Sequence, residues 1–272
     1  LRYLLPFTFN CTRQLIYLSL SHNRLDKIEE NVFKGLNLLK ELYLNNNRIK
    51  FINNDYFMNL ISVNTLNLAN NQLSKIEKLS FKNLKMLISL NLDNNCLFKL
   101  DKNLFNANNN SIYFYLSNNI ISEIKREYFT KLIRLLTLDL SFNKIFLIER
   151  ESFINLRSLL ELNLQSNQIN LISFDKIFMG LNRLKHLNLG LNRIEELSFE
   201  SFNILINLEK LNLDKNYIKN LSDVQNLKLD KLKVLNLKEN QINVLIRIKN
   251  LKSLENLYLS NNLIKEIEFS SN

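Results

Sequence analysis

The chain has 272 residues, of which 46% are hydrophobic, and a formal net charge of +10 at pH 7. This apolar content excludes a disordered chain, and no run of about 18 apolar residues occurs that could form a membrane-spanning helix. Three Gly in total are too few for a Gly-rich phosphate-binding loop. The positive charge raises nucleic-acid binding as a hypothesis, so the positions of Lys and Arg are more informative than their sum.

The first ten residues, LRYLLPFTFN, lack the basic, then apolar, then small-residue order of a signal peptide. Leu1 and Leu4 instead match the second half of a repeat, and the chain stops inside another repeat after Ile264 and Ile267. We therefore expect a segment of a longer protein that is cut at both ends. Any export signal or membrane anchor would then lie outside this chain.

Between these ends the sequence repeats itself, usually every 24 residues, in the frame L-x-x-L-x-L-x-x-N that is clearest in the stretch from Leu135 to Ser158. The eleven repeat starts are Leu15, Leu39, Val63, Leu87, Ser111, Leu135, Leu159, Leu184, Leu208, Leu232 and Leu254. The Asn residues of the frame are Asn23, Asn47, Asn71, Asn95, Asn119, Asn143, Asn167, Asn192, Asn216, Asn240 and Asn262. A Phe precedes most repeats by six residues, at Phe9, Phe33, Phe57, Phe81, Phe105, Phe129, Phe153, Phe178 and Phe202. Because repeats bury their apolar faces only against their neighbours, residues 1–272 are predicted to form a single solenoid.

The period of the apolar residues predicts the local structure of each repeat. Alternation around L-x-L indicates a short, half-buried strand, whose Leu side chains point into the coil. The turn that follows leaves backbone donors and acceptors inside the coil. An Asn side chain can pair with both kinds, so a column of stacked Asn residues is predicted to satisfy them. The Phe residues are expected to close the opposite side of the core.

One junction departs from the frame. The segment NANNNS, Asn106 to Ser111, has Asn108 and Ser111 at two positions where the other repeats have a large apolar residue. We interpret this as a loosened convex loop with an under-filled core layer. A bulge or flexible point beside a binding patch is the alternative.

The Leu, Asn and Phe positions of this unit resemble the leucine-rich-repeat family over essentially the whole chain. The typical 24-residue subclass is found in animal extracellular receptors and adhesion proteins, such as Toll-like receptors, chaoptin and Slit. The resemblance implies an α/β fold, a right-handed solenoid or horseshoe with a parallel β-sheet on the concave face and short helical or irregular convex segments. Two departures are the absence of Cys-rich terminal caps and the 22-residue unit from Leu232, which resembles intracellular phosphatase-regulator repeats.

The sequence gives little support for a catalytic or metal-binding site. His22 and His186 are seven repeats apart, about 34 Å at the spacing of strands, and neither is matched with a Ser or Cys nucleophile and an orienting carboxylate. The Cys and His residues lack any metal-ligand spacing. We therefore expect neither enzyme activity nor a metal or cofactor. Cys11 and Cys96 are too far apart for a disulfide and are predicted to be free thiols.

Glycosylation sequons begin at Asn10, Asn109 and Asn220. Chance supplies about as many in a chain so rich in Asn, so they carry little weight. All three lie away from the central strand positions, where a glycan would be tolerated.

The concave face of a solenoid is an extended, preformed surface, and we expect the function there. Acidic residues slightly outnumber basic ones on its strands and flanking turns. The excess positive charge falls on turns and convex loops, at positions such as Arg24, Arg48, Lys75, Lys82, Lys125 and Arg126. Nucleic acid requires clustered Lys and Arg with aromatic stacking platforms, so it is not expected as the main partner. The convex and lateral surfaces stay open to it.

Tyr113, Tyr115 and Phe142 are predicted to cluster on adjacent repeats beside Asn91 and Asp139. Exposed aromatic residues flanked by hydrogen-bonding groups are typical anchors of protein interfaces, whereas a scatter of tolerated surface aromatics is the alternative. The candidate ligand-binding residues are Tyr43, Asn67, Asn91, Tyr113, Tyr115, Asp139, Phe142 and Asn163.

These patterns favour a protein-recognition module, namely an ectodomain segment of a cell-surface or secreted receptor or adhesion protein that binds a protein ligand on its concave face. The alternative is an intracellular scaffold or enzyme-regulatory subunit in the cytoplasm. A membrane would be reached only through segments outside this chain. A homodimer stays open as an oligomeric state.

Overall fold

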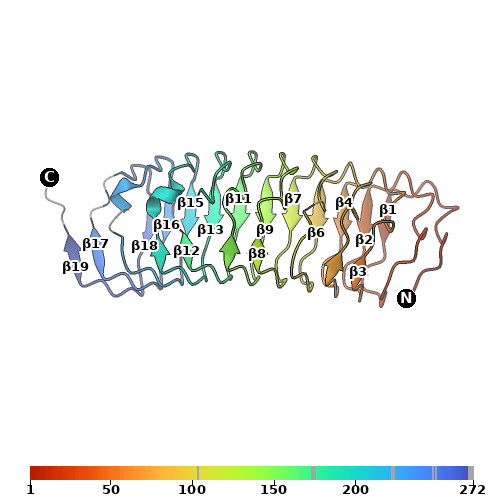
Figure 1. The fold of residues 1–272 in the computed structure, drawn as a ribbon, viewed down its shortest axis with the longest axis horizontal. Helices are drawn as coiled ribbons and strands as arrows, with labels where there is room; N and C mark the ends of the chain where they lie inside the picture. Colours follow the sequence, from red (N-terminus) through yellow and green to blue (C-terminus); the bar gives the residue numbers. More distant parts are fainter. Residues whose placement is uncertain (103, 173–175, 222–223, 247, 249, 269–272) are drawn as a thin grey trace.

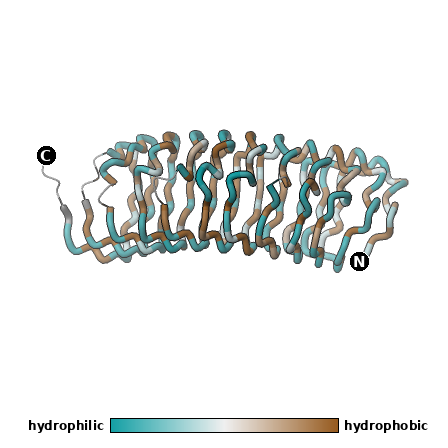
Figure 2. Tube along the Cα trace, viewed as in Figure 1, coloured by the Kyte–Doolittle hydropathy of each residue, from teal (hydrophilic) through white to brown (hydrophobic). Residues whose placement is uncertain are grey.

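The structure is a computed structural model that describes residues 1–102, 104–172, 176–221, 224–246, 248 and 250–268. The chain winds into an elongated solenoid, with its two ends at opposite ends of the body (Figure 1). Hydrophobic and hydrophilic segments recur at corresponding places from turn to turn of the coil (Figure 2). The repeat seen in the sequence is therefore also the structural unit.

A parallel sheet runs the length of the solenoid and forms its concave face. Within the described residues its eleven strands are β1 (Tyr17–Ser19), β2 (Glu41–Tyr43), β4 (Thr65–Asn67), β6 (Ser89–Asn91), β7 (Tyr113–Tyr115), β9 (Thr137–Asp139), β11 (Glu161–Asn163), β13 (His186–Asn188), β15 (Lys210–Asn212), β16 (Val234–Asn236) and β18 (Asn256–Tyr258). Neighbouring strands align one repeat apart, as in the pairing of Tyr113 with Thr137. Every strand of this sheet starts two residues after a repeat start predicted from the sequence.

Short strands and turns form the remainder of each coil. Two-stranded parallel sheets pair β3 (Phe51–Ile52) with β5 (Lys75–Ile76), β8 (Glu123–Ile124) with β10 (Leu147–Ile148), β12 (Leu171–Ile172) with β14 (Glu196–Leu197), and β17 (Val244–Ile246) with β19 (Glu266–Glu268). Helix in the described residues is limited to two 3-10 turns, η1 (Phe199–Phe202) and η2 (Val224–Asn226). The predicted solenoid with short helical or irregular convex segments is confirmed.

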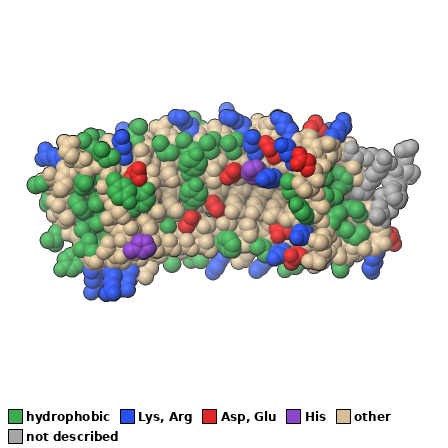
Figure 3. All heavy atoms as spheres, turned by 180° about the vertical axis from the view of Figure 1, so that it is seen from behind, with side chains coloured by type: hydrophobic (Ala, Val, Ile, Leu, Met, Phe, Trp, Pro, Cys, Tyr) green, Lys and Arg blue, Asp and Glu red, His purple; other side chains and the backbone are tan. Residues whose placement is uncertain are grey.

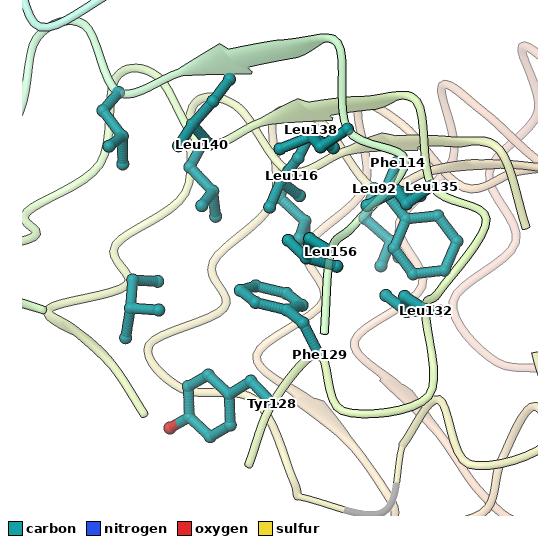
Figure 4. Close-up of a cluster of buried hydrophobic side chains, with 14 of the residues drawn as sticks. Leu92, Phe114, Leu116, Tyr128, Phe129, Leu132, Leu135, Leu138, Leu140 and Leu156 are labelled. Atoms are coloured by element: carbon teal, nitrogen blue, oxygen red, sulfur yellow. The ribbon is translucent and has the colours of Figure 1, made fainter. Parts of the chain in front are cut away.

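The inward residues of the repeat fill a continuous core between the sheet and the convex turns. Leu138 and Leu140 are completely buried, and the ring of Phe129 is 1% exposed. That ring stacks on Phe153 of the next coil at a centroid distance of 6.3 Å and an interplanar angle of 13°. Figure 4 shows Phe129 pointing into the space enclosed by Leu residues from several coils. The predicted burial is confirmed for every Phe of the column except Phe9, which is partly buried.

The Asn residues of the frame hold consecutive coils together. Asn143 Nδ2 donates to the carbonyl oxygens of Leu116, one coil earlier, and Leu140, at 2.9 and 3.1 Å. Its Oδ1 accepts a hydrogen bond from the backbone N–H of Ile121 at 3.0 Å. One side chain thus satisfies both kinds of buried backbone group, as predicted. The same Nδ2 bonds to two successive coils are made by Asn47, Asn71, Asn95, Asn119, Asn167, Asn192, Asn216 and Asn240.

The irregular junction keeps a regular backbone. Asn108 and Ser111 are both fully buried, and their N–H groups donate to Phe105 O at 3.0 Å and Asn108 O at 3.1 Å. Ser111 Oγ donates to Leu87 O at 3.0 Å, and Asn108 Nδ2 donates to Leu84 O at 3.0 Å. Both polar side chains therefore bond to the coil before them. The structure therefore does not have the expected loosened loop.

A large ring occupies the space that the two smaller residues leave. Phe114 stands where neighbouring strands have Leu90 and Leu138, and its ring centroid lies 4.7 Å from that of Phe105. Phe114 is 1% exposed and packs against Phe105, so a bulkier residue on the strand takes up space that the missing Leu side chains leave.

Candidate functional site

The strands of the concave sheet determine which side chains face outward. In most of them the middle residue is buried and the two flanking residues are partly exposed, as in β9, where Leu138 is inward and Thr137 and Asp139 are outward. Since the strands pair in register, the outward residues form columns across the repeats. Ligand contacts on this face would come from these columns.

Strand β7 presents two Tyr side chains on either side of the buried Phe114. Tyr113 is 38% exposed, and Tyr115 is partly buried. Burial raises the pKa of the Tyr115 hydroxyl, with smaller contributions from Tyr113 and nearby carboxylates. Tyr115 therefore stays neutral at physiological pH and can act as a hydrogen-bond donor.

A groove of about 520 Å³ begins at these Tyr residues and extends toward the C-terminal end. Its walls are the outward side chains of β7, β9, β11 and β13. The polar and aromatic residues that line it are Tyr113, Tyr115, Thr137, Asp139, Glu161, Asn163, His186 and Asn188. Four of the eight candidate residues, Tyr113, Tyr115, Asp139 and Asn163, are thus brought together in one hollow. We call this hollow the concave groove.

Glu161 and His186 are groove residues that the sequence analysis did not select. They face each other across β11 and β13, with His186 Nδ1 3.3 Å from Glu161 Oε1. The signal that could have found them is their position in one column of adjacent repeats. Figure 3 shows a histidine between acidic and basic side chains in the half of the molecule nearer the C-terminal end.

The outward Asp and Asn side chains also have a structural role. Asp139 Oδ1 accepts a hydrogen bond from Ser141 N at 2.8 Å, and Asn163 Oδ1 accepts one from Gln165 N at 3.1 Å. Such a bond to the backbone two residues on is a common turn-forming contact of Asn and Asp. The same contact is made by Asn67, Asn91, Asn188, Asn212 and Asn236. The abundance of Asn in this column is therefore explained in part by turn formation.

Asp93 adds a further carboxylate on the N-terminal side of the groove. Its Oδ1 accepts a hydrogen bond from Ser117 N at 2.7 Å. Burial raises the pKa of Asp93 despite that bond, and the charge of Asp139 acts in the same direction. The region around Tyr115 is therefore locally acidic, although the whole chain is basic.

Tyr43 lies at the N-terminal end of the sheet, away from the groove. Its hydroxyl donates to Glu41 Oε2 at 2.9 Å, and its ring centroid lies 5.3 Å from that of Tyr17. The hydrogen bond with Glu41 is the main reason that the pKa of Tyr43 is raised. Asn67 and Asn91 lie on the strands between Tyr43 and the groove.

Phe142 is exposed but does not line the concave groove. It lies in the turn after β9, with 49% of its surface accessible and a positive φ of 52°. Its backbone N–H donates to Gln165 O at 2.8 Å. The structure therefore places Phe142 in the turn after β9, whereas the Tyr pair with which the sequence analysis grouped it lies on strand β7.

The described residues contain no group of three or more His, Cys, Asp or Glu side chains arranged to hold a metal ion. Across that same part of the chain, no helix is long and apolar enough to cross a membrane. Cys11 and Cys96 are both exposed and free. Asn109 and Asn220 are exposed and Asn10 is partly so, but Ser222 of the last sequon lies outside the described residues.

Several solved structures have a similar shape. TLR13, in a complex with ssRNA13, is 29% identical, with a TM-score of 0.86 over 91% of this chain and 36% of that chain. Toll from Drosophila, in a complex with Spatzle, is 23% identical, with a TM-score of 0.73 over 88% of this chain and 37% of that chain. A leucine-rich-repeat protein of Leptospira interrogans is 25% identical, with a TM-score of 0.72 over 98% of this chain and 71% of that chain. This chain thus spans little more than a third of the TLR13 and Toll chains.

Sequence comparison gives the family directly. No curated protein matches the sequence. The family model for the leucine-rich repeat matches residues 13–73, 38–97, 112–169 and 206–264. These ranges cover well over half of the chain, which therefore belongs to the leucine-rich-repeat family.

Proposed function

We propose that this solenoid is a recognition module that binds a protein ligand in the concave groove. The observation that carries the proposal is the convergence of two partly exposed Tyr rings with carboxylate, amide and imidazole groups in one hollow of about 520 Å³. Tyr residues bury a large apolar area and still offer a hydroxyl, which makes them frequent anchors of protein interfaces. The strands fix these side chains in place, so little ordering would be needed on binding.

The charge of the groove favours a protein over a nucleic acid. Glu161 and Asp139 line it, Asp93 lies beside it, and no Lys or Arg is among its lining residues. Phosphate groups would be repelled by these carboxylates, since nucleic-acid binding relies on Lys and Arg. TLR13 has been solved with RNA and Toll with the protein Spatzle, so the fold itself accommodates both classes of ligand.

The proposal includes an extracellular or cell-surface location and no enzymatic activity. Its support is the likeness to TLR13 at 29% identity. An intracellular scaffold is the second candidate, favoured by the shorter repeat that starts at Leu232. Labelling of surface proteins on intact cells distinguishes the two, because only an exposed protein reacts with a membrane-impermeant reagent.

A photo-crosslinking experiment tests where the ligand binds. A benzoylphenylalanine replaces Tyr115 in the groove in one variant and Ile133, which is 50% exposed on the convex side, in the other. Both are illuminated with protein extracts of the source organism. Adducts specific to position 115 support the proposal, and the same adducts from both positions count against it.

Once the ligand is identified, Tyr115→Ala should weaken its binding by about 2 kcal/mol or more, the range of interface hot spots. The Phe142→Ala variant serves as the matched control, because it removes an exposed ring outside the groove. Titration calorimetry gives the affinities, and thermal unfolding checks that both variants stay folded. An unchanged affinity for Tyr115→Ala, or an equal loss in Phe142→Ala, would reject the groove as the binding site.

A further inference from the structure

A second hollow lies on the side of the solenoid near the N-terminal end and differs from the concave groove in its charge. It has a volume of about 550 Å³ and is lined by Arg2, Arg24, Asp26, Arg48, Lys50 and Gln72. Four of these six side chains are cationic and one is anionic. Figure 3 shows a block of basic side chains beside the histidine nearest the N-terminal end. We call this hollow the basic pocket.

The spacing of its cations is fixed by the repeat. Arg24 and Arg48 occupy the same position in consecutive coils, 24 residues apart. Their backbone N–H groups donate to Leu1 O and Leu25 O, in each case one coil earlier, at 2.7 and 2.8 Å. The two Arg residues are therefore separated by about one strand spacing, roughly 4.8 Å. Both side chains are exposed.

The cations of the basic pocket are poorly neutralised within the described part of the chain. Asp26 is the one carboxylate of the lining, and its Oδ2 lies 3.4 Å from Arg2 Nε. Some basic side chains elsewhere are paired with acids, as Lys125 is with Glu123 and Lys185 is with Glu209. Four cations around one hollow with a single carboxylate among them repel one another.

We propose that the basic pocket binds a tetrahedral oxyanion group, a phosphate or sulfate ester, between Arg24, Arg48 and Lys50. Arg guanidinium groups donate in a planar fork that matches two oxygens of such a group. Two Arg residues one coil apart can both donate to the three terminal oxygens of such a group, sharing one of them, and Lys50 adds a third positive charge. The bound anion removes the repulsion between the cations. This site is independent of the concave groove, which lies several repeats further along the sheet.

Two small probes test the proposal and distinguish a phosphate ester from a sulfate ester as the bound group. Tripolyphosphate and sucrose octasulfate are titrated separately into the chain by calorimetry at low ionic strength. Saturable binding is expected for at least one of them, and it should weaken as NaCl is raised, because salt screens exposed charges. The probe that binds more tightly identifies the phosphate or the sulfate as the preferred group.

A charge-matched pair of variants assigns the binding to the pocket. Arg24→Gln with Arg48→Gln removes two positive charges from the lining and should weaken binding at least about tenfold, since each charged hydrogen bond contributes substantially. Arg157→Gln with Arg183→Gln removes the same charge from exposed positions elsewhere and should leave the affinity within about twofold. Circular dichroism checks that both variants fold. Absence of saturable binding to either probe, or an equal loss in the two variants, overturns the proposal.

Discussion

Replacing Phe129 by Ala tests whether the stacked rings of the convex side stabilise the solenoid. The ring is 1% exposed and packs on Phe153 and, edge-on, on Tyr128. A buried aromatic side chain removes about 150–250 Å² of surface from water, which corresponds to roughly 4–6 kcal/mol at about 25 cal/mol per Å². Ala keeps part of that burial and leaves a cavity. We therefore expect Phe129→Ala to lower the free energy of unfolding by about 3–5 kcal/mol.

Urea unfolding followed by far-UV circular dichroism measures this loss. Phe142→Ala removes the same ring from a position that is 49% exposed, and it should cost less than about 1 kcal/mol. Because each repeat packs only on its neighbours, hydrogen exchange should accelerate around Leu116 and Leu140 and stay unchanged near Leu44. A loss below about 1 kcal/mol for Phe129→Ala, or a uniform change in exchange along the chain, would refute this account of the core.

Three further predictions concern polar side chains that are buried or partly buried. Asn143→Ala leaves the N–H of Ile121 without its partner and removes one of the two Asn hydrogen bonds to each of Leu116 O and Leu140 O. It should cost about 1–3 kcal/mol in urea unfolding, and a cost under about 1 kcal/mol would contradict the role of the Asn column. Burial raises the pKa of Asp93 in the folded chain above its value in the unfolded chain. The contribution of the Asp93 carboxyl to stability is therefore fully present below the unfolded-state pKa, and it is lost as the pH rises through the folded-state pKa. Asp93→Asn should therefore stabilise the protein at pH 7 and have little effect near pH 3, as measured by unfolding curves at the two pH values. A larger stabilisation at pH 3 than at pH 7 would reject this reasoning. Asn108→Leu should destabilise by about 1–3 kcal/mol because it overpacks the layer filled by Phe114. Combined with Phe114→Leu it should cost clearly less than the sum of the single changes in a double-mutant cycle, and strictly additive costs would show that the two positions do not compensate.

The sequence by itself determined the coil and its inward face. The alternation around Leu138 and Leu140 specifies a strand with one buried side, and a turn with buried backbone groups requires a side chain like that of Asn143. These constraints are local and recur in every repeat, so the start of each concave strand follows from the sequence alone. The position of Tyr113 and Tyr115 on the outward face follows for the same reason.

Only the tertiary structure decided which outward residues converge and how an irregular layer is filled. Asn108 looked like a defect because its compensation comes from Phe114, on a strand that sequence reasoning treated as a separate element. Glu161 and His186 enter the groove, and Phe142 does not, because a groove depends on how side chains of different length lean across neighbouring strands. A pattern of period two fixes the direction of each side chain relative to its own strand. It does not fix the volumes and distances between side chains of adjacent coils, and those distances define the binding surface.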